Sequence, residues 1–67
     1  MKKYYVDLQT LPLSERADAI SRMDGVAFLA TEVYEAGVLV GANVFWNSDT
    51  EPLPSDIPPS GCTYRPV

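Results

Sequence analysis

VAFLATEVYEAGVLVGANVFWN, residues 26–47, contains two runs rich in Val, Leu, Phe and Ala that are interrupted at residues 35–37. β-Branched and aromatic residues favour strands, and a glycine between two such runs is typical of a β-hairpin. We predict strands over residues 26–34 and 38–46. A three-residue loop with Gly37 in the left-handed conformation fits better than a two-residue loop, which prefers Asn-Gly or a leading glycine.

This loop places Tyr34 opposite Val38 and sorts the hairpin side chains onto two faces, which a register slip of one residue would exchange. One face carries Val26, Phe28, Ala30, Glu32, Tyr34, Val38, Val40, Ala42, Val44 and Trp46, and the other carries Ala27, Leu29, Thr31, Val33, Leu39, Gly41, Asn43 and Phe45. Both faces are too apolar for water, and one short helix covers only one of them. The second face therefore requires the C-terminal segment, a second copy of the chain or another partner.

A strand and a helix precede the hairpin. Residues 3–8 alternate in polarity, which predicts a first strand. Ser14 suits a helix N-cap and Gly25 a C-cap, so we predict a helix over residues 14–24. Its expected apolar stripe consists of Leu13, Ala17, Ile20 and Met23. We expect Phe28 and Trp46 to pack beneath it.

The remaining residues form a proline-rich tail. Five of the six prolines fall within residues 48–67. The apolar residues spaced through this tail, which we expect to anchor it on the sheet, are Leu53, Ile57, Tyr64 and Val67. Residues 62–65 suit a short edge strand. The predicted fold is a single α+β domain, β-α-β-β over residues 1–47, with an extended tail over residues 48–67.

Charge is unevenly distributed along the chain. The net charge is −4, and no basic residue occurs between Arg22 and Arg65. The acidic residues in that interval are Asp24, Glu32, Glu35, Asp49, Glu51 and Asp56. Such a field repels nucleic acid and membrane phosphate and attracts basic protein surfaces. We therefore expect a basic protein partner, and neither nucleic acid nor membrane. The single cysteine and the absence of a signal-peptide core after Lys2 and Lys3 favour a cytoplasmic location.

The sequence offers little for catalysis. It has no histidine, which removes the commonest general base and the usual metal ligand, and it lacks the glycine-rich phosphate-binding motifs. Glu32 and Glu35, on a strand and its turn, do not converge as a catalytic pair. Cys62 has no cationic neighbour nearer than Arg65. We expect no enzyme, no cofactor and no metal.

The leading hypothesis is therefore a small acidic module that docks onto a larger, locally basic protein and modulates or inhibits it. Phage and mobile-element antagonists of similar size and charge provide an analogy. The candidate partner-binding residues are Tyr5, Glu32, Tyr34, Glu35, Leu39, Phe45, Asp49 and Glu51. A homo-oligomeric structural or accessory subunit, with a dimer as the favoured state, is the alternative. A further one is an oligomer that sequesters a small anion through Lys2, Lys3, Arg16 and Arg22.

Overall fold

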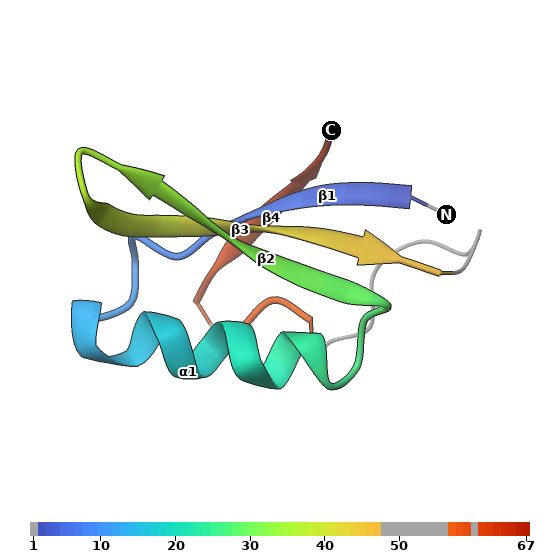
Figure 1. Ribbon diagram of the computed structural model, residues 1–67, viewed down its shortest axis with the longest axis horizontal. Helices are drawn as coiled ribbons and strands as arrows, with labels where there is room; N and C mark the ends of the chain where they lie inside the picture. Colours follow the sequence, from blue (N-terminus) through green and yellow to red (C-terminus); the bar gives the residue numbers. More distant parts are fainter. Residues whose placement is uncertain (1, 48–56, 60) are drawn as a thin grey trace.

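The protein is a four-stranded antiparallel sheet with one helix on one face. The computed structural model describes residues 2–47, 57–59 and 61–67. In chain order its elements are β1 (Lys2–Asp7), α1 (Leu13–Asp24), β2 (Leu29–Glu35), β3 (Val38–Trp46) and β4 (Thr63–Pro66). The strand order is β2-β3-β1-β4, and α1 lies along one side of the sheet (Figure 1). The predicted α+β class is confirmed.

Helix α1 is also the connection that this strand order requires. Strands β1 and β2 both pair antiparallel with β3, so they run in the same direction on either side of it. Strands that run in the same direction need a long crossover, and a helix packed on the sheet is the usual one. The apolar stripe of α1 is thereby held against β2 and β3.

The helix differs from the prediction at its start. It begins at Leu13, one residue early, and Pro12 takes the N-cap position without a side-chain hydrogen bond. The predicted cap at Ser14 is therefore wrong, because the Pro12 carbonyl already accepts the first helical bond from the Glu15 amide, at 2.9 Å. The predicted C-cap at Gly25 is confirmed, since its amide bonds to the Ser21 carbonyl.

The buried face of α1 is rotated by about one position from the predicted stripe. Ala19, Ile20 and Met23 are buried, whereas Leu13 and Ala17 are exposed. Arg16, one turn before Ala19 and Ile20, is partly buried on the same side of the helix. With Met23, these residues follow the i, i+3, i+4, i+7 spacing of a helix face that packs on a core.

The hairpin turn contains two residues, not the three that we predicted. Ala36 and Gly37 both have positive φ, at 52° and 80°, as a type I′ turn requires. Tyr34 pairs with Leu39 instead of Val38, and the register shifts at a bulge between Val33 and Tyr34. The left-handed conformation predicted for Gly37 is confirmed, whereas the loop length was wrong, because alanine rarely adopts positive φ and Ala36 gave no signal of it.

The bulge moves one predicted residue into the core. Leu39 is only 7% exposed and packs in the core, so the prediction that it shares an accessible face with Phe45 is wrong. Strand β3 carries an extra residue at the bulge, which reverses the face of its side chains near the turn. Where residues 29–33 pair with residues 41–45, the predicted faces hold: Ala30 lies opposite Val44, on the side that packs against the core.

The core lies between the sheet and α1. Its fully buried large side chains are Tyr4, Val6, Leu8, Met23, Val44 and Ile57. Trp46 is partly buried against this core, close to its predicted place. Phe28 is 60% exposed, so its predicted burial under the helix is wrong. Strand β2 begins only at Leu29, and Phe28 belongs to the connection from α1.

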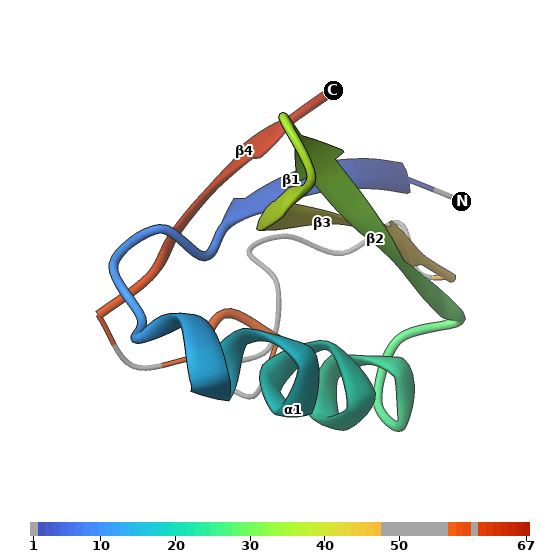
Figure 2. The same ribbon diagram turned by 60° about the vertical axis from the view of Figure 1, so that its left-hand side comes forward.

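The described part of the tail completes the sheet. Strand β4 begins one residue later than predicted and pairs with β1, and the amide of Val67 donates to the carbonyl of Lys3 at 3.0 Å. Residues 57–59 run beside α1 on the same side of the sheet (Figures 1 and 2). Ile57 is buried as predicted, whereas Val67 is 71% exposed and is no anchor. Leu53 lies outside the described residues.

Candidate functional site

Exposed apolar side chains concentrate on β2 and its two flanks. Seven large hydrophobic residues of the described chain are exposed, and five of these lie within residues 26–38. They are Val26, Phe28, Leu29, Tyr34 and Val38. Among the described residues, β2 pairs only with β3, so its other edge has no neighbouring strand there (Figure 2). Apolar surface beside an open strand edge is typical of an interaction site.

The same stretch is acidic. The exposed carboxylates of Asp24, Glu32 and Glu35 lie on or beside β2. No basic residue occurs between positions 23 and 64 to neutralise them from within this part of the sequence. We call these three residues, together with Val26, Phe28, Leu29 and Tyr34, the acidic edge.

Hydrogen bonds order part of the acidic edge. The Ala30 amide donates to the Asp24 carboxylate at 3.0 Å, which ties the end of α1 to the start of β2. The Tyr34 hydroxyl donates to the Glu32 carboxylate. This hydrogen bond, with smaller contributions from desolvation and from the negative charge of Glu32, raises the pKa of Tyr34. Tyr34 and Glu32 are thus presented together on one side of β2.

The face of the sheet opposite α1 is open in a different way. Lys3 lies over the ring of Phe45, with 5.6 Å from its Nζ to the ring centroid. Arg65 lies over the ring of Tyr5, with 4.6 Å from its Cζ to the ring centroid. Among the described residues no helix covers this face (Figure 2). Because the two rings already contact cations of the same chain, this face presents aromatic groups that carry a positive charge above them.

The predicted partner-binding residues fall into separate groups. Glu32, Tyr34 and Glu35 lie together on β2, within the acidic edge. Tyr5 and Phe45 lie on β1 and β3, on the face opposite the helix. Leu39 is in the core, as described above, and Asp49 and Glu51 lie outside the described residues.

Four residues of the acidic edge, Asp24, Val26, Phe28 and Leu29, were not among the predicted site residues. Val26 and Phe28 were assigned to a strand face, and only the late start of β2 exposes them. The capping contact of Asp24 depends on how the connection folds back, for which the sequence pattern holds no signal.

Two of the four basic residues proposed to bind an anion already have partners within the chain. Arg16 binds three backbone carbonyls, those of Leu11 at 3.1 Å, Leu39 at 2.7 Å and Gln9 at 3.3 Å. Arg22 pairs with Asp18 on the exposed side of α1, at 3.2 Å. Arg16 is therefore a structural clip that joins the β1–α1 loop to β3, because its guanidinium donates hydrogen bonds to backbone carbonyls of both.

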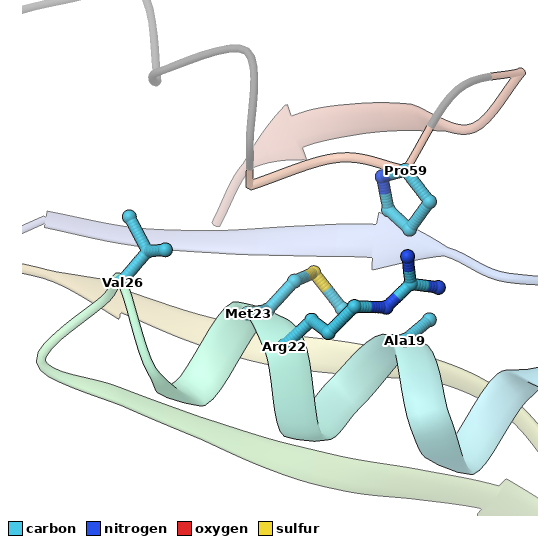
Figure 3. A pocket seen from close by; sticks show the side chains of 5 residues that line it. All are labelled: Ala19, Arg22, Met23, Val26 and Pro59. Atoms are coloured by element: carbon cyan, nitrogen blue, oxygen red, sulfur yellow. The ribbon is translucent and has the colours of Figure 1, made fainter.

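A small hollow lies between α1 and the described part of the tail. Its volume is about 270 Å³, and it is lined by Ala19, Arg22, Met23, Val26 and Pro59 (Figure 3). The Arg22 side chain reaches across it toward Pro59, and the other lining groups are apolar. Arg22 is the charged residue among the lining residues, and it is already paired with Asp18. The hollow therefore lacks the several converging polar groups that a specific ligand site needs.

Other chemical features of the described residues are few. No group of three His, Cys, Asp or Glu side chains is placed to bind a metal within the described ranges. The partly buried thiol of Cys62 contacts the Thr10 hydroxyl at 3.4 Å. No helix in the described part of the chain has the length and apolar character needed to span a membrane. Comparisons with family models, curated proteins and solved structures found no match.

Proposed function

We propose that this protein is a non-enzymatic binding module that docks through its acidic edge onto a locally basic surface of a larger protein. The observation that carries this proposal is the coincidence of exposed apolar and acidic side chains on one strand edge. Phe28 and Tyr34, 60% and 58% exposed, provide the large aromatic groups that supply much of the binding energy in protein interfaces. The surrounding carboxylates provide attraction to a basic partner and accelerate encounter.

Docking alone is sufficient for a regulatory effect. A bound module excludes whatever else its partner's basic surface recognises, such as nucleic acid or an acidic protein segment. Inhibition or modulation of the partner is therefore the proposed consequence. The comparison with phage and mobile-element antagonists remains an analogy from size and charge.

The test is affinity capture with two charge-matched variants. E32Q/E35Q removes two charges from the acidic edge, and E15Q/D18N removes two from the exposed side of α1. A partner that the wild type and E15Q/D18N capture, that E32Q/E35Q loses, and whose binding weakens as salt rises would support the proposal. Equal capture by both variants, or equal loss, would contradict it, because the charge would then act without regard to position.

A homo-oligomeric accessory subunit is the second candidate. The observation that favours it is the sheet face opposite α1, on which no described helix packs and which carries Phe45 and Leu29. Molar mass in solution, measured by light scattering at low and high salt, separates the two. A dimer that persists at high salt supports self-association through apolar surface, and a monomer supports docking to a different protein.

A further inference from the structure

We infer that docking takes the form of strand addition: the partner supplies an extended segment that pairs antiparallel with the free edge of β2. This inference rests on the proposed function and specifies the partner's chemistry. Addition of a strand to an exposed sheet edge is a recurrent recognition mode in which backbone hydrogen bonds give affinity and alternate side chains give specificity.

The backbone of β2 shows which groups are available. The Ala30 amide points away from β3, because it donates to Asp24 and not to the neighbouring strand. Amides alternate between the two edges of a strand, so Glu32 and Tyr34 also direct their backbone groups to the outer edge. Asp24 thus caps the first position of the edge and leaves the two following outward positions for an added strand.

The two edges of the sheet differ in how well they resist pairing, as far as the described residues show. Strand β4 has only four residues, and one of them, Pro66, has no amide hydrogen to donate. Strand β2 has seven residues and contains no proline and no lysine, the residues that most often block edge pairing. Between the two edges of this sheet, the geometry therefore favours β2.

The side chains of β2 define what the added strand carries. Glu32 lies on the face that packs toward the helix, since it pairs with the buried Ala42. Leu29 and Val33 lie on the opposite face, paired with Phe45 and Gly41. A matching strand alternates basic residues on the helix side with apolar residues on the other. A second copy of β2 would instead bring its own Glu32 and Glu35 to this edge, and like charges there disfavour that occupant.

The experiment uses capped peptides that alternate Val and Lys over the length of β2. In antiparallel pairing, the peptide residues directly opposite Glu32 and Tyr34 direct their amides toward β2, and these are the Lys residues. Methylation of the Lys backbone nitrogens therefore removes the hydrogen bonds that the peptide donates to β2 and places methyl groups between the two strands. Methylation of the Val nitrogens is the matched control, because those amides point away from β2. A peptide that alternates Val and Glu tests the charge requirement.

Nuclear magnetic resonance of the labelled protein gives the readout. With the Val–Lys peptide we expect the amide signals of Glu32 and Tyr34 to shift and their hydrogen exchange to slow by about tenfold or more. The Val-methylated peptide should reproduce this effect, whereas the Lys-methylated and Val–Glu peptides should abolish it. In the charge-reversed variant E32K, the preference should move to the Val–Glu peptide.

Several results would overturn strand addition. These are equal binding of the two methylated peptides, shifts confined to β4 or to Tyr5 and Phe45, and no change at millimolar peptide. Slowed exchange at Glu32 in concentrated protein without peptide would assign the edge to a second copy. If the capture experiment succeeds while the peptides fail, the docking function stands and this mode of docking falls.

Discussion

The ring of Tyr5 occupies the space that a side chain at Gly41 would need. A Cβ at position 41 would overlap the phenol of Tyr5 and would lie 2.7 Å from the carbonyl oxygen of Val6. Gly41 lies on β3 directly beside β1, so the end of the Tyr5 ring reaches from β1 over Gly41. The missing side chain is thus what allows Tyr5 to lie on the sheet with Arg65 stacked on it.

Gly41→Ala should therefore destabilise the fold by about 1–3 kcal/mol, since the Val6 carbonyl is backbone and yields little. The control is Gly25→Ala, where φ is −74° and the nearest atom to an added Cβ is 3.5 Å away. That change should be neutral or stabilise by up to about 1 kcal/mol. Chemical denaturation of both variants measures the difference, and an unchanged midpoint for Gly41→Ala would contradict the overlap.

Arg16→Met should lower the free energy of unfolding by about 1.5–3 kcal/mol, because it leaves part-buried backbone carbonyls without their charged donor. Arg16→Lys should recover only part of this loss, since an ammonium cannot span three carbonyls as the planar guanidinium does. Arg22→Met, which breaks only an exposed pair with Asp18, should cost less than about 0.5 kcal/mol. Equal effects at both arginines would show that Arg16 is not a clip.

Ile57→Ala should cost about 2–5 kcal/mol, a large share of the stability of so small a domain. The reason is that Ile57 is fully buried in the core although it precedes β4 by several residues. Val67→Ala, at a side chain that is 71% exposed, serves as the control and should change stability by less than about 0.5 kcal/mol. Thermal or denaturant unfolding distinguishes them, and a silent Ile57→Ala would mean that the tail is not part of the cooperative core.

Tyr34 should titrate above the ordinary tyrosine pKa of 10.0, because its neutral hydroxyl donates to Glu32. A raised pKa favours the protonated form in the folded state, so the associated stability is present below pH 10.0 and is lost as pH rises through the raised value. Glu32→Gln should bring the pKa back toward 10.0, and Glu35→Gln should not. Carbon-13 signals of the tyrosine rings follow the titration residue by residue, and an identical Tyr34 pKa in Glu32→Gln would show that the Glu32 carboxylate does not raise it.

Periodicity was enough to predict the fold class, because it is set by many residues together. The alternation of β1, the strand β3 from Val38 to Trp46 and the presence of one helix followed from apolar spacing alone. The short edge strand around Tyr64 was also predicted, with its bounds one residue too early. Patterns of this length survive local irregularities, since no single side chain decides them.

Single-residue geometry was not predictable in the same way. The conformation of Ala36 shortens the turn, and the bulge beside Val33 then transfers Leu39 from the open face to the core. Each of these is a local departure from the average preference of its residue type, stabilised by the packing of the whole domain. The candidate site was affected likewise: Glu32 and Tyr34 followed from the sequence, whereas the exposure of Phe28 depended on where β2 begins.

The position of β1 between β3 and β4 has a consequence for the order in which the domain folds. Tyr4 pairs with Val44 on one side and with Pro66 on the other, whereas the β2–β3 hairpin closes over two residues at Ala36 and Gly37. The entropy of loop closure is small for the hairpin and large for both contacts of β1. Folding should therefore nucleate at the hairpin and helix, with β4 docking late. Substitutions in the turn should slow folding, and substitutions in β4 should mainly speed unfolding.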